Sequence, residues 1–206
     1  ERIGGAALAC AVDVSKKDQV QAMAQSAVQA WGGIDVLVNN AGTTHKNKAA
    51  LDVTEDEFDR IFRVNVKGLF WAAQAVLPIM VGQGAGCVVN VASTTGVRPG
   101  PGLTWYSATK AAMINLAESL YFDLSPLGIG VSVVNPGFVA TPLTAQNKFA
   151  MPALLQPEEA AAYMLKGWAD GEFEIHYPKR FSRWLKFMRL LPYRWYFGLV
   201  RSATKM

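Results

Sequence analysis

The sequence predicts an α/β protein built on a doubly wound parallel sheet with helices on both faces. Apolar segments of strand length alternate along the chain with amphipathic segments of helix length, which is the order of strands joined by helical crossovers. The strand segments are apolar throughout, as in strands covered on both faces. Because no repeat, low-complexity tract or linker interrupts this order, we expect one domain over residues 1–177 and an extension over residues 178–206.

The first elements follow from apolar runs and the polar residues that close them. A buried strand over Ala6–Val12 ends at Asp13, since a short apolar run closed by a polar residue is typical of a covered strand. Ser15 is a suitable N-cap for a helix that runs to about Trp31. Ile34–Val38 is the next predicted buried strand, and it leads into a polar loop.

The middle of the chain predicts a long helix and a third strand. Thr54 and Glu57 have the spacing of a capping box, which marks the start of a helix. We expect this helix to run to about Pro78. Cys87–Val91 is the third predicted strand, and a loop rich in glycine and proline, Gly96–Gly102, follows it.

The C-terminal half repeats the alternation. A helix is predicted over about Trp105–Leu127, followed by a fourth strand over Gly130–Asn135. Thr141–Pro152 is predicted to be a loop or lid over the site. Pro157 suits the first turn of another helix, and Phe173–Tyr177 is predicted to be a short fifth strand.

The composition argues against a membrane-spanning, disulfide-bonded or metal-binding protein. Apolar residues make up 51% of the chain, yet no run approaches the roughly 20 apolar residues of a spanning helix. Cys10 and Cys87 lie in apolar, strand-like sequence and are interpreted as small buried hydrophobes. His45 and His176 have no partner at metal-ligand spacing, so we expect no metal site and a cytoplasmic location.

The positive net charge belongs to the C-terminal extension. Residues 178–206 hold eight basic and no acidic side chains, whereas the rest of the chain holds 12 basic and 16 acidic ones. The domain itself is therefore acidic, and we expect no nucleic-acid partner.

Tyr106 and Lys110 form the most informative pair in the sequence. Residues four apart share one face of a helix, and an ammonium beside a phenol lowers the pKa of the phenol. Such a tyrosine can exchange a proton with a carbonyl or alcohol oxygen. Ser93, at the end of a predicted strand, could hold the same oxygen. The spacing alone also fits an exposed amphipathic pair.

Polar and turn-forming residues follow the predicted strands at one edge of the sheet. Asp13, Asn39-Asn40, Ser93 and Pro136-Gly137 each come directly after a strand. Ligands of open α/β sheets bind beyond the carboxyl ends of the strands. We therefore expect these residues to form one binding site.

Taken together, these motifs resemble the short-chain dehydrogenase/reductase family over nearly all of the chain from Ala6 to about Ala169. The matching motifs are Asp13-Val14, Asn39-Asn40-Ala41-Gly42, Asn65, Asn90-Val91-Ala92-Ser93, Tyr106 with Lys110, and Pro136-Gly137 with Thr141. The resemblance implies a Rossmann-like fold and NAD or NADP as cofactor. It also implies a homodimer or tetramer formed through the helices that carry Asn65 and Tyr106.

The resemblance implies a role for each of four catalytic residues. Tyr106 would be the general acid in carbonyl reduction or the base in alcohol oxidation. Lys110 would lower the pKa of this tyrosine and bind the nicotinamide ribose. Ser93 would orient and polarise the substrate oxygen, and Asn65 would hold a water that links Lys110 to solvent.

The resemblance also implies a set of cofactor-binding residues. Besides Tyr106 and Lys110, the implied set consists of Asp13 and Val14 at the adenine, Asn40, Ala41 and Gly42 on the adenosine side, Pro136 and Gly137, and Val139 and Thr141 at the nicotinamide end. The choice between NAD and NADP is not readable from these residues.

Several of these residues also have a structural interpretation. Asn65 could bond a neighbouring backbone and tie down a strand, and Asn39 could satisfy a local turn. Ser93 could cap the loop that follows it, and Asp13 could belong to the turn before the first helix. These alternatives stay open at the level of the sequence.

The sequence departs from the family pattern near its start. The glycine-rich turn that meets the cofactor pyrophosphate at a helix N-terminus has no counterpart, since Gly4-Gly5 precedes the wrong strand. We therefore expect the chain to be an N-terminally truncated part of a longer enzyme, lacking about two strands and two helices. The strand ending at Asn39 would then have an open apolar edge.

The extension adds a second departure. Phe181, Trp184, Leu185 and Met188 recur at helical spacing among arginines and lysines, and Pro192 interrupts the pattern. A basic, aromatic, amphipathic helix can lie on an anionic membrane, which would make the protein peripheral to a membrane. The same helix could instead pack its apolar face over the substrate site or on another subunit.

Two functions from different classes follow. The first is an NAD(P)-dependent oxidoreductase for a carbonyl/alcohol pair, with a hydrophobic substrate favoured by the apolar loops over Val97–Trp105 and Phe138–Met151. The alternative is a truncated, non-catalytic binding or membrane-associated module.

Overall fold

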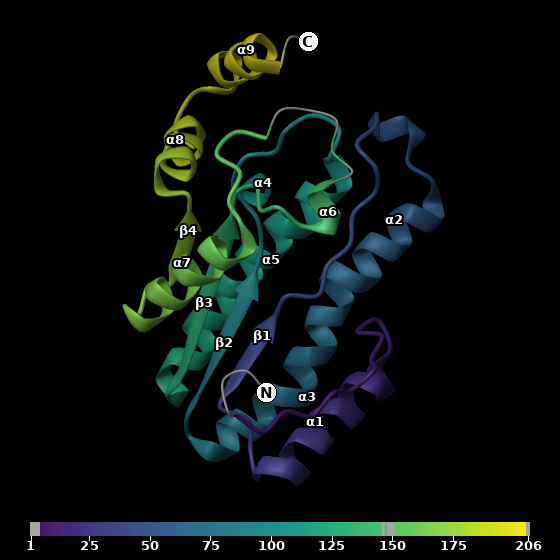
Figure 1. The fold of residues 1–206 in the computed structure, drawn as a ribbon, viewed down its shortest axis with the longest axis vertical. Helices are drawn as coiled ribbons and strands as arrows, with labels where there is room; N and C mark the ends of the chain where they lie inside the picture. Colours follow the sequence, from purple (N-terminus) through teal and green to yellow (C-terminus); the bar gives the residue numbers. More distant parts are fainter. Residues whose placement is uncertain (1–4, 146, 148–150, 205–206) are drawn as a thin grey trace.

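The computed structural model describes residues 5–145, 147 and 151–204. Its centre is a sheet of four parallel strands in the order β1-β2-β3-β4 (Figure 1). The strands are β1 Val36–Asn39, β2 Gly86–Val91, β3 Ile129–Pro136 and β4 Glu174–Tyr177. This arrangement confirms the predicted parallel sheet, including the short last strand.

Helices connect the strands and continue beyond the last one. The α-helices are α1 Lys17–Trp31, α2 Glu55–Phe62, α3 Gly68–Gln83, α4 Thr94–Val97, α5 Thr104–Leu124, α6 Pro142–Ala145, α7 Pro157–Ala169, α8 Lys179–Arg189 and α9 Tyr193–Thr204. A π-helical segment, Arg63–Lys67, joins α2 to α3, and single 3-10 turns cover Ala50–Asp52 and Ser125–Leu127. Pro192 separates α8 from α9, as the sequence predicts.

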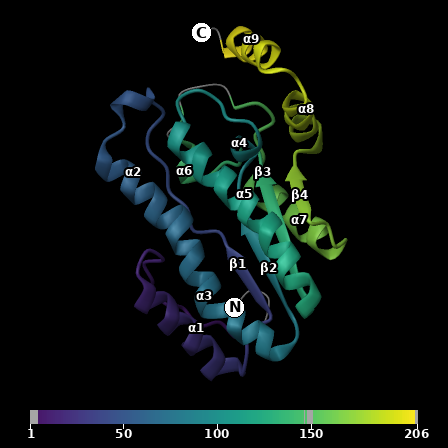
Figure 2. The ribbon, with the colours of Figure 1, turned by 180° about the vertical axis from the view of Figure 1, so that it is seen from behind.

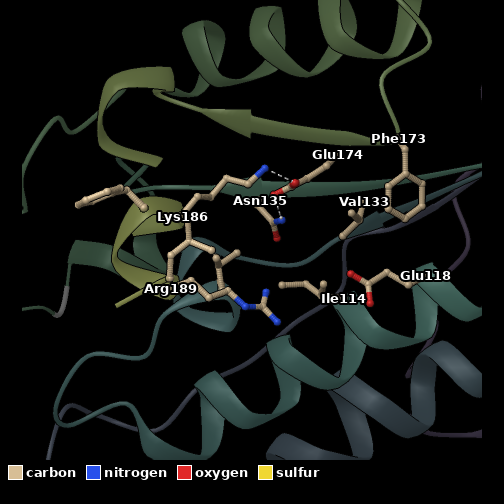
Figure 3. A pocket seen from close by; sticks show the side chains of 11 residues that line it. Ile114, Glu118, Val133, Asn135, Phe173, Glu174, Lys186 and Arg189 are labelled. Atoms are coloured by element: carbon tan, nitrogen blue, oxygen red, sulfur yellow. Dashed lines mark hydrogen bonds and ion pairs between the residues drawn. The ribbon is translucent and has the colours of Figure 1, made fainter. Parts of the chain in front are cut away.

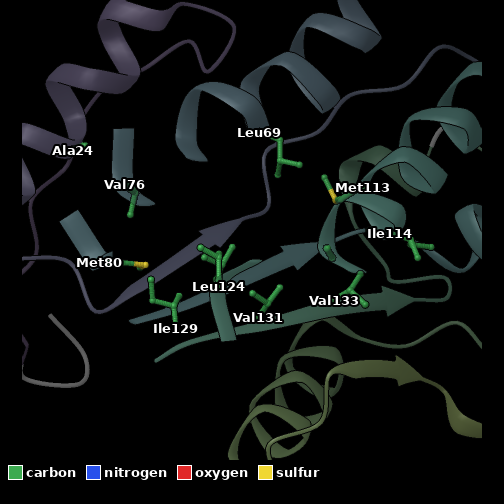
Figure 4. Packing of buried hydrophobic residues seen from close by; sticks show 13 residues of the cluster. Ala24, Leu69, Val76, Met80, Met113, Ile114, Leu124, Ile129, Val131 and Val133 are labelled. Atoms are coloured by element: carbon green, nitrogen blue, oxygen red, sulfur yellow. The ribbon is translucent and has the colours of Figure 1, made fainter. Parts of the chain in front are cut away.

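The helices cover both faces of the sheet, which makes the fold doubly wound. Figures 1 and 2 show α5 on one face and α7 on the other. The larger core lies on the α5 face, where α1, α3 and α5 contribute Ala24, Val76 and Met113 beneath the strands (Figure 4). A smaller core joins the other face to α7 through Val89, Val134, Ala160, Ile175 and Tyr177.

The first predicted strand is wrong. Ala6–Val12 forms no strand, and Leu8 within it is 51% exposed. A parallel strand needs a neighbour to bond its backbone, and no described strand lies beside this segment. Apolar content alone therefore does not make this segment a strand.

The N-cap predicted for the first helix is also wrong. Lys16 occupies the N-cap of α1, and its side chain makes no capping hydrogen bond. Ser15 lies in a turn instead, where its backbone N–H donates to Asp13 Oδ1 at 2.9 Å. The carboxylate of Asp13, two residues before Ser15, thus closes the turn that precedes α1.

The second helix begins as predicted but runs further. Thr54 and Glu57 form a complete capping box. Pro78 does not end the helix, which continues to Gln83 and closes with Gly84 in the left-handed conformation. The buried side chains Val76 and Met80 on either side of Pro78 hold the helix on the core, which offsets the hydrogen bond that proline removes.

This continuous helix, Glu55–Gln83, changes one conclusion drawn from composition. By length and composition it is apolar enough to cross a membrane, and within the described ranges it is the one helix that passes this test. Core helices pass the same test, and Leu69, Val76 and Met80 belong to the large core. The apolar face of the helix therefore covers the sheet.

Strand β1 is less covered than its apolar sequence predicts. Val36 is 39% exposed and Val38 49% exposed. Among the strands of the described part of the chain, β1 pairs only with β2. One edge of β1 is consequently open, as expected for the strand that ends at Asn39.

Candidate active site

Ser93 and Tyr106 meet beyond the carboxyl end of β2. Ser93 follows β2 and is the N-cap of α4, where its Oγ accepts a hydrogen bond from Thr95 N at 3.2 Å. The Ser93 side chain also lowers the pKa of Tyr106 on α5, because the two hydroxyls lie close together. Ser93 therefore both caps the loop and contacts the tyrosine, so its two interpretations are compatible.

Lys110 lies one turn along α5 from Tyr106. Its Nζ is 5.7 Å from the centre of the Tyr106 ring and donates to the Val91 carbonyl oxygen at 2.7 Å. Burial lowers the pKa of Lys110 to about 8, because a low-dielectric environment disfavours the charged form. The α5 helix thus holds a buried ammonium beside the phenol.

The pKa of Tyr106 is raised in this structure. Burial is the larger cause, and the Ser93 hydroxyl acts in the opposite direction. The sequence predicts a lowered pKa, but the Lys110 ammonium bonds to Val91 rather than to the phenol. A raised pKa keeps the phenol protonated at neutral pH, which suits a proton donor.

A glycine brings the two halves of this arrangement together. A Cβ built on Gly96 of α4 would lie 2.6 Å from the Lys110 carbonyl carbon and 2.9 Å from Ala111 N. Real Cβ atoms do not approach a backbone this closely, so only glycine fits. The absence of a side chain here lets α4, and with it Ser93, pack directly on α5.

Asn65 ties the loop after β1 to α5. It is fully buried within the π-helical segment. Its Oδ1 accepts from Thr43 N at 2.8 Å, and its Nδ2 donates to Thr43 O at 2.9 Å and to Thr109 Oγ1 at 3.0 Å. These bonds match the structural interpretation of Asn65, and π-helical turns are frequent at functional sites.

Several predicted cofactor residues lie close to this group. A Cβ built on Gly42 would be 3.6 Å from Lys110 Nζ and 3.7 Å from Asn65 Oδ1. A cavity of about 80 Å³ is lined by Val14, Asn40 and Ala41 together with Asn65. The residues after β1 therefore adjoin the catalytic candidates, as expected from the sheet edge.

Asp13 is placed differently from its neighbour Val14. Its exposed carboxylate is hydrogen-bonded to Ser15, which lowers the pKa of Asp13. Val14 packs on α3, since a Cβ on Gly68 would lie 3.0 Å from Val14 Cγ2. Asp13 thus stands in the turn before α1, as its structural interpretation has it, while Val14 faces the cavity.

The residues after β3 form a separate stretch of the same edge. Gly137 N donates to the Tyr177 carbonyl oxygen at 2.7 Å, so Pro136-Gly137 stays beside β4. Val139 bridges to Leu155, and Thr141 N donates to Thr144 Oγ1 at 3.0 Å. Part of the predicted lid, residues 146 and 148–150, lies outside the described residues, as do Gly4 and Lys205.

Asn39, the other strand-end asparagine, has a structural role. Its Nδ2 donates to Asn90 Oδ1 at 2.9 Å, and the two residues are partners in the β1–β2 register. The bond links the carboxyl ends of two adjacent strands. The role is structural, but the partner is a side chain on the next strand rather than the local turn that the sequence suggested.

Sequence reasoning missed Thr109, which is fully buried between the two catalytic candidates of α5. Its Oγ1 donates to the Tyr106 carbonyl oxygen at 2.8 Å and accepts from Asn65. The sequence did contain a signal for Thr109, because it lies three residues after Tyr106 and residues three apart share one face of a helix.

Sequence reasoning also missed the contacts of the C-terminal helices with the loop after α4. Arg98 Nη2 donates to the Met188 carbonyl oxygen at 2.9 Å, and its guanidinium lies 4.4 Å from the Tyr196 ring centre. Tyr196 Oη donates to the Pro99 carbonyl oxygen at 2.7 Å. The extension therefore holds the loop that begins at Ser93.

A larger cavity lies apart from these residues. It has a volume of about 460 Å³ and lies between α5, β3, β4 and α8 (Figure 3). Asn135 donates to Glu174 in its wall, and Lys186 of α8 pairs with the same carboxylate. Ser93, Tyr106 and Lys110 do not line this cavity. Although it is larger than the cavity beside Asn65, it therefore takes no part in the proton chemistry.

Comparison with known proteins gives a consistent set of relatives. A family model described as short chain dehydrogenase matches residues 1–151. A 4-formylbenzenesulfonate dehydrogenase of Comamonas testosteroni is 56% identical over 141 residues, which is 68% of this chain. A 3-oxoacyl-[acyl-carrier-protein] reductase of Thermotoga maritima is 35% identical over 164 residues, 75% of this chain. The chain spans 56% of the length of the first relative and 66% of the second.

Two solved structures share the fold. A 3-ketoacyl-(acyl-carrier-protein) reductase of Brucella melitensis, solved with NADH, has a TM-score of 0.76 and 37% identity over 85% of this chain and 78% of that one. A short chain dehydrogenase/reductase of Burkholderia phymatum, solved with NAD, has a TM-score of 0.81 and 27% identity over 90% of this chain and 75% of that one.

Proposed function

The chain belongs to the short-chain dehydrogenase family, and on that premise we propose that it is an NAD(P)-dependent oxidoreductase that interconverts a carbonyl and an alcohol. The observation that carries this proposal is the approach of the Ser93 hydroxyl to Tyr106, whose pKa it lowers, with the Lys110 ammonium 5.7 Å from the tyrosine ring. Two hydroxyls at one point can hold a single substrate oxygen, and one of them can pass it a proton.

In the proposed reaction each side chain handles the substrate oxygen or its proton. The Ser93 hydroxyl donates a hydrogen bond to the carbonyl oxygen and polarises it. Tyr106 gives its proton to that oxygen during reduction and takes it back during oxidation. Lys110 stabilises the phenolate that reduction leaves. The carbon centre exchanges a hydride with the nicotinamide, which is the chemistry that the bound cofactor supplies.

Asn65 takes a positioning role in this proposal. Its amide is committed to Thr43 and Thr109, so the side chain has little capacity left for a water. Asn65 itself fixes the loop beside Lys110.

The described residues fit part of an NAD(P) molecule. Asn40, Ala41 and Gly42 are exposed beyond the carboxyl end of β1, where dinucleotides bind in such sheets. The glycine at position 42 leaves room beside Lys110 Nζ. These residues would hold the adenosine and ribose portions, with Val139 and Thr141 at the nicotinamide end. A glycine-rich turn for the pyrophosphate is not found within residues 5–145.

The substrate class is proposed from the relatives and from the site's surroundings. The two relatives named above have a formyl compound and a 3-oxoacyl thioester in their names, and both are carbonyl compounds. Trp105, which precedes Tyr106 on α5, packs edge-on against Phe58 at 5.2 Å between ring centres. We therefore propose a hydrophobic carbonyl substrate.

A homo-oligomer is proposed on the faces of α3 and α5 that point away from the sheet. Phe70 and Val81 on α3 are 48% and 44% exposed, and Tyr121 and Phe122 on α5 are 44% and 75% exposed. Exposed apolar side chains on adjacent helices are typical of subunit interfaces. Light scattering of the purified protein measures the assembly directly.

A turnover assay tests the proposed activity. The protein is mixed with NADH or NADPH and with 4-formylbenzenesulfonate or a 3-oxoacyl thioester, and oxidation of the cofactor is followed. We expect cofactor oxidation that depends on the carbonyl compound, together with quenching of tryptophan fluorescence on cofactor binding. Absence of both signals would favour the alternative, a non-catalytic binding module.

A further inference from the structure

The C-terminal helices carry the densest group of exposed apolar side chains in the described part of the chain. Seven large apolar residues between positions 184 and 199 are 45–81% exposed. No other stretch of this length among the described residues has more than four. We name these seven the tail patch: Trp184, Phe187 and Leu190 on and after α8, and Tyr193, Trp195, Phe197 and Leu199 on α9.

Exposed arginines accompany the tail patch. Lys179 and Lys186 are paired with Glu172 and Glu174 of the domain. Five arginines remain exposed, and the described residues give none of them a carboxylate partner: Arg180, Arg183, Arg189, Arg194 and Arg201. Residues 178–206 contain no acidic side chain. The surface thus has unbalanced positive charge beside exposed aromatic rings.

Helix α8 sorts its residues between two faces. Ser182 and Met188 are buried against the domain at 2% and 6% exposure. Arg183 and Trp184 are exposed, and the Trp184 ring stacks at 5.7 Å on Phe187, which is half exposed and also lines the 460 Å³ cavity. Positions three and four apart share one face, so charge and aromatic surface are presented together.

The domain holds this surface in place. Ser182 bonds to His176 Nδ1 at 2.6 Å, and Arg98 bonds to the Met188 carbonyl oxygen at 2.9 Å. On α9, the buried Tyr196 is bonded to Pro99. Figure 1 shows α8 and α9 extending past the carboxyl ends of the strands, on the side away from the N-terminus. The tail patch is therefore a fixed outer surface near the site.

We propose that the tail patch and its five arginines bind the surface of an anionic lipid bilayer. Tryptophan and tyrosine favour the boundary between headgroups and acyl chains, and arginines on an amphipathic helix attract anionic lipids. A second copy of the tail patch is a less suitable partner, because its arginines would lie against the arginines of the first copy and repel them. Single-stranded nucleic acid stacks on aromatic rings, but it offers nothing for Leu190 and Leu199, which are 81% and 45% exposed.

Vesicle flotation of the full protein tests this proposal. The probes are vesicles of phosphatidylcholine alone and vesicles in which roughly a third of the lipid is phosphatidylglycerol. We expect at least a fivefold larger bound fraction on the anionic vesicles, a decrease with added salt, and a blue shift of tryptophan emission on binding. Equal binding to both kinds of vesicle, or binding to neither, would overturn the proposal.

Matched variants locate the binding surface. Trp184→Ala with Phe187→Ala removes part of the apolar patch, and Arg180→Gln with Arg183→Gln removes charge. Leu165→Ala, which changes a residue 56% exposed on α7, is the apolar control. We expect each tail variant to reduce flotation severalfold, the control to have no effect, and cofactor-linked turnover to be unchanged in all three. Equal loss in the control would overturn the assignment.

Two other occupants are distinguished by the same variants. Light scattering reports whether the Trp184→Ala, Phe187→Ala protein changes its assembly, and anisotropy reports binding of a labelled single-stranded oligonucleotide. A loss of assembly or of oligonucleotide binding with vesicle binding unaffected would overturn the membrane proposal. Vesicle binding that alone depends on the tail patch would support it.

Discussion

Tyr106 is placed so that its proton is available to a substrate oxygen. Burial raises the pKa of the phenol while the Ser93 hydroxyl opposes that effect, and the Lys110 ammonium lies 5.7 Å from the ring. The Ser93 hydroxyl, which favours the phenolate, thus acts against burial, which favours the phenol. In the proposed reaction this balance lets one residue serve as acid and as base.

Burial of the Lys110 ammonium lowers the free energy of unfolding, and this cost disappears when high pH deprotonates the amine. Burial lowers its pKa from 10.5 to about 8, so between these two values the unfolded chain binds more protons than the native protein. The free energy of unfolding therefore rises with pH through this window. Relative to Lys110→Met, the wild type should gain up to about 3 kcal/mol from pH 8 to pH 10.5.

Urea unfolding of both proteins at several pH values measures this difference. Lys46→Met, which changes an exposed lysine in the loop after β1, is the matched control. A wild-type advantage that stays flat or falls across the window would contradict the buried ammonium.

At the residue scale, the sequence predicts which side chains carry the proposed chemistry. It does not predict the contacts that these side chains make. The positions of Ser93, Tyr106 and Lys110 were predicted from spacing and family resemblance, and the hydroxyls of two of them, Ser93 and Tyr106, lie close together in the structure. The bonds of Asn65 to Thr43 and Thr109 were not predicted. They depend on how a loop and two helices pack, and no short-range pattern reports that.

At the scale of elements, the contact of α4 with α5 positions the serine. The Cβ that glycine lacks would stand 2.6 Å from the Lys110 carbonyl carbon. Helix α4 is only four residues long, so its position depends on this contact rather than on its own stability. The site thus relies on one glycine outside its reacting groups.

Gly96→Ala should destabilise the protein and impair the site. Relieving the overlap needs a shift of backbone, and overpacking of this kind costs about 1–3 kcal/mol or more. Gly100→Ala, in the loop that follows α4, is the control, because a Cβ there would meet nothing within 4 Å. Thermal unfolding of the two variants gives the comparison. Equal melting temperatures would show that α4 does not pack on α5 in this way.

Some elements are predicted correctly from the sequence and others are not, and the difference has a physical cause. The capping box at Thr54 and Glu57 is a local signal, and the structure confirms it. The strand predicted at Ala6–Val12 is wrong because a strand also needs a partner, which apolar content does not supply. The sequence predicts that the helix ends near Pro78, whereas packing of Val76 and Met80 on the core carries the helix past it.

At the scale of the whole molecule, the C-terminal helices connect the active-site end to the outer surface. Arg98 lies between the body and the extension, bonded to Met188 and stacked on Tyr196. These contacts join residues about 90 positions apart in the chain. The extension therefore stabilises the loop that follows Ser93, and its outer face remains available for a partner.

Tyr196→Phe should loosen the loop after α4. The change removes the bond from Tyr196 Oη to the Pro99 carbonyl oxygen, which is 2.7 Å long, and one such bond contributes about 1 kcal/mol. Amide hydrogen exchange of residues 97–103 should become severalfold faster. Tyr193→Phe, at a residue 67% exposed, is the control and should leave the exchange unchanged. Identical exchange rates in the two variants would contradict the claim that Tyr196 stabilises this loop.

The arrangement of the extension was predictable only in part. Helical spacing predicts one helix that Pro192 interrupts, and the structure confirms this helix as α8 and adds α9 after the proline. The sequence left open whether the apolar face packs or stays exposed. In the structure part of the apolar surface packs and part stays exposed. Met188 and Tyr196 are buried, whereas Trp184 and Phe197 are more than half exposed. Long-range contacts decide such a division, and a single sequence does not report them.

Replacement of Tyr106 by phenylalanine tests the central claim most directly. We expect Tyr106→Phe to fold as the wild type does and to keep the KM for the cofactor. Its kcat for carbonyl reduction should fall by about 10²–10⁴, the usual contribution of a general acid. Tyr121→Phe, on the exposed side of the same helix, should retain full activity. A Tyr106→Phe enzyme within a few fold of the wild-type kcat would contradict the assignment of Tyr106 as the proton donor.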